Sequence, residues 1–189
     1  ANFDVGTTLY GDPRDENPNG LQVTVFGEIV GDTGSFSVDL APMAASHPNV
    51  LLDEFYFSLV SPASDYTVTV QDPASWLVKT PADVVGGGNN AGFLFEASGP
   101  NADRPDISTP LLFTVVKNVD FVVTDFTDSV TFSSNDVILG GGQLGAHLQS
   151  LNLADCTPVC TEDSGFVLGD WTATNNDPTP MAEPGVMAL

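Results

Sequence analysis

Apolar and polar positions alternate along most of the chain, which is the pattern of half-buried β-strands. Between Leu21 and Val30, the residues Leu21, Val23 and Val25 share one face, while Gln22 and Thr24 lie on the other. The same alternation, or a short β-branched and aromatic run, occurs at residues 35–40, 51–60, 66–70, 76–79, 93–97, 111–116, 119–126, 131–139, 144–151 and 165–172. The pattern predicts about ten short strands.

Turn-forming residues separate these segments. The chain contains 18 Gly and 14 Pro, and nineteen of its 25 acidic residues are Asp, whose short side chain bonds the local backbone of a turn. Lys, Arg and Glu are scarce, so the predicted helix is limited to one short turn within 41–49. We therefore expect an all-β fold, an antiparallel, jelly-roll-like β-sandwich over residues 1–173. It would begin with an acidic entry segment at 1–20, and a Pro-rich tail would follow at 174–189.

The charge excludes two classes of partner. The formal net charge is -21 and the chain has four Lys and Arg, so it lacks the basic patch that binds nucleic acid or anionic lipid. No apolar run approaches 18 residues, which argues against membrane insertion by the chain. The negative charges repel one another, so we expect divalent cations or salt to stabilise the fold.

The sharpest local motif lies at residues 15–20. Asp15, Asn17 and Asn19 occupy positions 1, 3 and 5 of a calcium loop, and Gly20 occupies the turn position. Position 12 is Phe26 rather than the usual Glu, so another acidic residue would have to complete the site. The candidate calcium ligands are Asp12, Asp15, Asn17, Asn19 and Glu28. The alternative is an acidic turn without a metal ion.

Two cysteines, Cys156 and Cys160, are separated by three residues, among them Pro158. This spacing closes a small disulfide loop, which is typical of exported proteins. Free thiols are the first alternative. Zinc is the second, but it needs two further ligands, and His47 and His147 do not stand at a standard spacing from the cysteines.

Catalytic motifs are missing from the sequence: there is no Gly-x-Ser-x-Gly elbow, no His-Glu-x-x-His and no phosphate loop. His147 could serve a Ser or an Asp, but a lone His in an apolar strand is more typical of a structural residue. We therefore expect a protein that is not an enzyme. Five aromatic residues lie within or beside strand patterns, where core packing is the default and a sugar-stacking platform the alternative: Tyr10, Tyr56, Tyr66, Trp76 and Trp171.

Two passages carry a family resemblance. The tail contains Glu183 and Pro184 after Ala182, followed by small and apolar residues. Upstream, Ala-His-Leu-Gln at 146–149 precedes Ser-Gly-Phe-Val-Leu-Gly at 164–169. Together they resemble the PEP-CTERM sorting-signal family of exported bacterial proteins. Ala182 replaces the first Pro of the family's core, and the family's membrane helix and basic cluster do not appear in the sequence.

The resemblance implies export through a cleaved signal peptide, which suits a chain that starts at Ala1, and a place outside the cell or on its outer surface. It also implies a link to exopolysaccharide and biofilm. We expect a non-enzymatic structural protein, a filament or biofilm subunit that assembles with itself or another surface protein by strand or tail exchange. The alternative is a calcium-assisted carbohydrate-binding module for exopolysaccharide, and a glycoside hydrolase is a third hypothesis.

Overall fold

A computed structural model describes residues 2–11, 20–82, 92–127, 130–134, 137–151 and 164–175. The strands are β1 (Asn2–Tyr10), β2 (Gln22–Val30), β3 (Thr33–Asp39), β4 (Leu51–Phe57), β5 (Tyr66–Asp72), β6 (Leu77–Lys79), β7 (Phe95–Ser98), β8 (Leu111–Lys117), β9 (Val130–Ser134), β10 (Val137–Gly142), β11 (Leu144–Gln149), β12 (Ser164–Gly169) and β13 (Thr172–Asn175). Four short 3-10 turns join them: η1 (Ala41–Met43), η2 (Ala63–Asp65), η3 (Asn101–Asp103) and η4 (Val123–Phe126). None of the helical segments in these ranges has the length and apolar character needed to cross a membrane.

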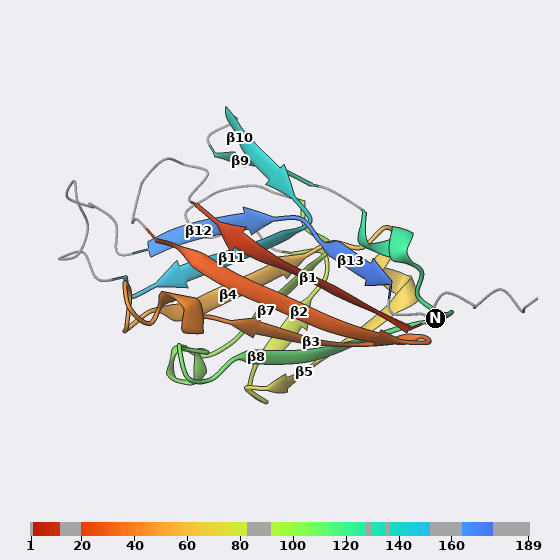
Figure 1. The fold of residues 1–189 in the computed structure, drawn as a ribbon, viewed down its shortest axis with the longest axis horizontal. Coiled ribbons are helices and arrows are strands. Elements are labelled where there is room, and N and C mark those ends of the chain that lie inside the picture. The colour runs from red at the N-terminus through yellow and green to blue at the C-terminus, as the bar shows by residue number, and fades with distance from the viewer. Residues whose placement is uncertain are drawn as a thin grey trace, which may run out of the picture.

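Eleven strands form one antiparallel sheet in the order β5-β8-β3-β2-β1-β12-β11-β4-β7-β6, with β13 also paired to β1 (Figure 1). β9 and β10 make a separate hairpin. The predicted all-β, antiparallel fold class is confirmed. The short helical turn predicted within 41–49 is present as η1.

The sheet curls so that its two halves face each other. β8 and β4 are far apart in the strand order, yet the ring of Phe113 on β8 lies 5.8 Å from that of Phe55 and 5.2 Å from that of Phe57 on β4. Hydrogen bonding continues from one half to the other where Tyr10 of β1 lies opposite Leu168 of β12. The strands therefore form one nearly closed sheet around a shared core.

The alternation read from the sequence matches the burial. Val23, Val25 and Gly27 are buried, whereas Phe26, which lies between Val25 and Gly27, is exposed. One face of β2 therefore lies on the core and the other faces solvent. Four of the five aromatic residues considered above are buried, as their default interpretation predicted. Tyr10 differs, since 62% of its surface is exposed.

Three expectations about elements were wrong. The entry segment contains β1, which pairs with β2 along its whole length and buries Phe3, Val5 and Leu9. The strand expected at 119–126 is instead a loop followed by η4. The strand expected at 165–172 is interrupted, because β12 ends at Gly169 and β13 begins at Thr172. β12 pairs with β11 along its length, whereas β13 pairs with β1.

Candidate functional site

A β-bulge on β4 brings two acidic side chains together. His147 of β11 lies opposite Glu54, whereas the next residue, Leu148, lies opposite Leu52, so Asp53 is an extra residue in the ladder. In a regular strand, neighbouring side chains point to opposite faces, and a bulge removes that constraint locally. As a result, ligand atoms of Asp53, Glu54 and His147 all lie within 4.8 Å of one another. We call these three residues the bulge cluster.

The imidazole of His147 lies between the two carboxylates. Its Nδ1 atom is 3.0 Å from Oδ2 of Asp53 and 3.3 Å from Oε2 of Glu54, and the side chain is 9% exposed. Neither oxygen lies in line with the ring N–H, so Nδ1 makes no hydrogen bond of good geometry. Burial alone would lower the pKa of His147, but the two carboxylates outweigh it and raise the pKa to about 9.

Three neighbours hold the carboxylates in place. Arg104 forms an ion pair with Oδ1 of Asp53 through Nη2, and its Nη1 donates a hydrogen bond of 2.9 Å to Oε1 of Gln149. Nε2 of Gln149 donates to Oδ2 of Asp53 at 2.8 Å, and the Tyr56 hydroxyl donates to Oε2 of Glu54. Each carboxylate oxygen that faces His147 therefore also accepts a hydrogen bond from a fixed side chain.

The charges around the bulge cluster keep both acids ionised. Burial raises the pKa of Asp53, but the contacts with His147 and Arg104 are together stronger, and the net pKa is lowered. Burial likewise raises the pKa of Glu54, while the contact with His147 and the hydrogen bond from Tyr56 bring it below its ordinary value. Both groups are carboxylates at neutral pH.

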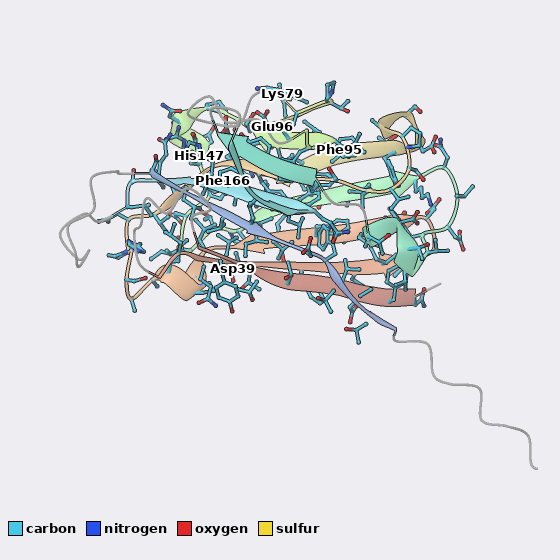
Figure 2. All side chains as sticks on the ribbon, turned by 90° about the horizontal axis from the view of Figure 1, so that it is seen from above. Asp39, Lys79, Phe95, Glu96, His147 and Phe166 are labelled. Atoms are coloured by element: carbon cyan, nitrogen blue, oxygen red, sulfur yellow. The ribbon has the colours of Figure 1, made fainter. Side chains whose placement is uncertain are left out.

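A small aromatic cluster explains why a histidine on the outer face is buried. Tyr56, Phe93 and Phe166 pack together outside the main core, with ring centroids 5.4 Å and 5.8 Å from Tyr56. The His147 ring lies 6.4 Å from that of Phe166, its cross-strand neighbour on β12 (Figure 2). These rings cover one side of the imidazole and leave Nδ1 facing the carboxylates.

The bulge cluster contains residue types that can hold a cation. Within the described part of the chain, no hydroxyl or thiol is bonded to His147, so a nucleophile of the Ser–His kind has no counterpart there. A histidine with a pKa of about 9 is also protonated at neutral pH and makes a poor general base. One imidazole nitrogen and two carboxylate oxygens are, however, common metal ligands.

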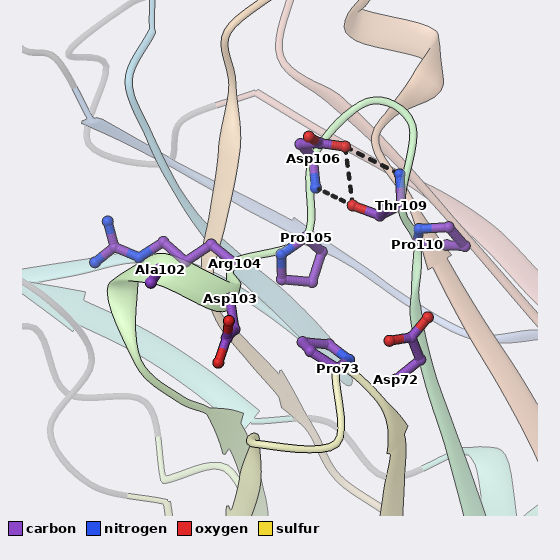
Figure 3. Close-up of a pocket in the computed structure, with 9 residues that line it drawn as sticks. All are labelled: Asp72, Pro73, Ala102, Asp103, Arg104, Pro105, Asp106, Thr109 and Pro110. Carbon is purple, nitrogen blue, oxygen red and sulfur yellow. Dashed lines mark hydrogen bonds between the residues drawn. The ribbon is translucent and has the colours of Figure 1, made fainter.

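A pocket of about 310 Å³ lies beside the bulge cluster, between the end of β5 and η3 (Figure 3). Arg104 contributes to its wall, but the guanidinium points away from it and reaches Asp53 instead (Figure 3). Asp106 at its rim accepts hydrogen bonds from the backbone and side chains of Ser108 and Thr109, which lower its pKa. The carboxylate of Asp106 thus stabilises its own turn.

A second hollow, of about 320 Å³, lies on the outer face of the opposite half of the sheet. We call it the Phe26 groove, because Phe26 is 50% exposed there. The residues lining it are Phe26, Glu28, Ser35, Phe36, Ser37, Gln71 and Leu112. It offers one aromatic face beside several hydrogen-bonding groups.

Most residues singled out from the sequence lie outside the described residues: Asp12, Asp15, Asn17, Asn19, Cys156, Cys160, Glu183 and Pro184. The calcium loop, the disulfide and the sorting signal therefore stay predictions. Glu28 is described, and it is exposed on β2 opposite Asp4.

The sequence pattern did not indicate the bulge cluster. His147 was read as a structural residue, and Asp53 and Glu54 were not singled out. The available signal was a pair of adjacent acids inside the otherwise apolar strand β4. Their partners come from far along the chain, since Gln149 is 96 positions from Asp53.

The chain matches no protein-family model, and no curated protein or solved structure matches it.

Proposed function

We propose that this chain is a non-enzymatic structural protein of the extracellular matrix or outer cell surface, which assembles by pairing β5 of one copy with β5 of a second copy. The observation that carries the proposal is the open edge of β5. Among the described strands, β5 is bonded only to β8 and ends the sheet on one side. β6 ends it on the other side and lies near β5 without being paired to it. An open edge presents unpaired backbone groups to which another strand can add.

The burial along this edge shows what an added strand would cover. Val68 and Val70 of β5 pack against the core but remain half-buried. Their cross-strand neighbours on β8, Val115 and Phe113, are 0% and 1% exposed. A strand beyond β5 would remove the remaining apolar surface of the two valines from water, at about 25 cal/mol per Å².

The residues of the edge favour addition. From Tyr66 to Gln71 the strand reads Tyr-Thr-Val-Thr-Val-Gln, with no charged residue and no Pro. Edges that avoid pairing usually carry Lys or Pro, as β6 does with Lys79. Two copies of β5 can pair antiparallel about a two-fold axis, so that each edge covers the other. The charge of -21 on each copy opposes this approach, and salt should relieve that repulsion.

The extracellular part of the proposal is supported by the resemblance of the tail around Glu183 to the PEP-CTERM sorting signal. A disulfide between Cys156 and Cys160 would suit the same compartment, because disulfides persist outside the cytoplasm.

Sedimentation velocity at low and high salt tests the assembly. We expect the wild-type chain to associate increasingly as salt is raised, and Thr69→Lys to weaken association by at least about tenfold, which is about 1.4 kcal/mol. Thr114→Lys is the matched control, because Thr114 lies opposite Thr69 on β8 but away from the edge. A wild-type chain that stays monomeric at high salt and high concentration would contradict the proposal, as would equal effects of the two substitutions.

The Phe26 groove favours a second candidate function, a calcium-assisted carbohydrate-binding module for polysaccharide. A half-exposed ring beside Glu28, Ser37 and Gln71 offers a stacking face with hydrogen-bonding groups around it. Binding to a glycan array, with and without calcium, should be lost in Phe26→Ala if the groove binds sugar. Unchanged binding in that variant would reject the groove as the sugar site.

A further inference from the structure

The bulge cluster presents ligand atoms from two strands to one point. Two ligands of a metal ion at about 2.0–2.2 Å can be no more than about 4.4 Å apart. Nδ1 of His147 is 3.0 Å and 3.3 Å from the facing oxygens of Asp53 and Glu54, within that limit. We propose that Asp53, Glu54 and His147 form a binding site for a divalent transition-metal ion of the zinc class.

The unsatisfied nitrogen of His147 is an independent sign of a ligand. Buried polar atoms in proteins nearly always have a hydrogen-bond partner. The side chain of His147 is 9% exposed, and its Nδ1 atom lies 3.0 Å and 3.3 Å from two carboxylate oxygens, yet neither contact has the geometry of a hydrogen bond. A metal ion bound between Nδ1 and these oxygens would give the nitrogen the partner that it lacks.

The surrounding hydrogen bonds are those expected around metal ligands. Ligating carboxylates are normally fixed by outer donors, which set their orientation. Gln149 donates to the facing oxygen of Asp53, and Tyr56 donates to that of Glu54. Arg104 pairs with Oδ1 of Asp53, which leaves Oδ2 turned toward the imidazole.

The charge of the site fits a divalent cation. His147 carries a proton at neutral pH, and a metal ion bound at Nδ1 must displace it to solvent. With the imidazole then neutral, the two carboxylates and the Arg104 guanidinium sum to one negative charge in a largely buried position. A divalent ion changes this sum to one positive charge. The two carboxylates attract the cation, and the single guanidinium of Arg104 only partly offsets this attraction.

The donor set selects the class of metal. Imidazole suits zinc, nickel, copper and iron, whereas calcium and magnesium prefer sites made of oxygen alone. Three protein ligands leave a fourth position for water, as in open zinc sites. Such an ion would tie β4 to β11, and it is distinct in chemistry and position from the calcium loop predicted near Asp15.

Isothermal titration calorimetry with zinc chloride tests the site. The chain should carry Cys156→Ser and Cys160→Ser to remove thiols, and the buffer should contain excess magnesium to occupy exposed carboxylates. We expect a single zinc ion per chain, with affinity weakened at least about tenfold in His147→Gln and in Glu54→Gln. The matched controls, His47→Gln and Glu28→Gln, should bind zinc as the parent chain does.

A second measurement reports on the parent chain itself and needs only a folded His47→Gln control to assign the spectrum. The chain has two histidines, so the His47→Gln control assigns the imidazole nitrogens of His147 in a ¹H–¹⁵N spectrum of the folded protein. Zinc should shift the Nδ1 resonance of His147 in proportion to the zinc bound. An unmoved His147 resonance at saturating zinc, no zinc uptake by the parent chain, or equal uptake by folded His147→Gln would overturn the proposal.

Discussion

Glu54 of β4 and His147 of β11 lie directly opposite each other, and the extra residue Asp53 brings a second carboxylate to within 3.0 Å of the same imidazole. The charged histidine therefore stabilises the metal-free fold. The pKa of His147 is raised from 6.5 to about 9 in the folded protein, so its contribution is complete below about pH 6.5 and is lost as the pH rises through 9.

The first prediction follows from this shift. In the presence of a chelator, the free energy of unfolding should fall by an amount on the order of 3 kcal/mol between about pH 6 and pH 9.5. The cause is that His147 loses its proton at a lower pH in the unfolded chain than in the folded protein. Urea denaturation at the two pH values measures this fall. His147→Gln should remove most of it, and a variant with the same pH dependence as the wild type would contradict the assignment.

The second prediction concerns the ion pair between Lys117 and Asp125. Nζ of Lys117 lies 2.7 Å and 2.8 Å from the two carboxylate oxygens, and both side chains are buried. Lys117→Met should destabilise the fold by about 3–5 kcal/mol, because it leaves a buried carboxylate without its cation. Lys117→Met with Asp125→Asn should recover part of this loss in denaturant unfolding. A double variant no more stable than Lys117→Met would contradict this account.

The third prediction concerns the close packing of Phe36. A methyl group added at Gly27 would lie 2.5 Å from two atoms of the Phe36 ring, which also stacks on Phe113 at 4.9 Å. Gly27→Ala should therefore cost about 1–3 kcal/mol through overpacking. In a thermodynamic cycle, Gly27→Ala combined with Phe36→Leu should cost less than the sum of the two single changes. Strict additivity would show that the two residues do not compete for space.

Much of the sheet was predictable from alternation, and the failures have physical causes. β2 was recognised because Val23 and Val25 face the core while their neighbours face solvent. The segment expected as a strand at 119–126 instead forms a loop and η4, which bury both Phe121 and Phe126. β-Branched and aromatic residues favour a strand but do not exclude a buried loop, so their presence alone could not decide between the two. A loop and η4 turn both rings inward.

The bulge cluster could not be predicted because it depends on register. Asp53 and Glu54 share a face through the bulge, and the bulge exists through the pairing of β4 with β11, a strand distant in the sequence. The open edge was equally hidden, since which strand ends the sheet depends on the strand order and not on the sequence of β5.

Hydrogen–deuterium exchange of the wild-type chain, dilute at low salt and concentrated at high salt, tests the proposed assembly most directly. Pairing of β5 with β5 of a second copy would protect the outward-facing amides of that edge, while β2 in the interior of the same sheet would be unchanged. The account predicts slower exchange in Tyr66–Asp72 under associating conditions. Unchanged exchange in β5 while the chain associates would show that it assembles through another surface and would contradict the account.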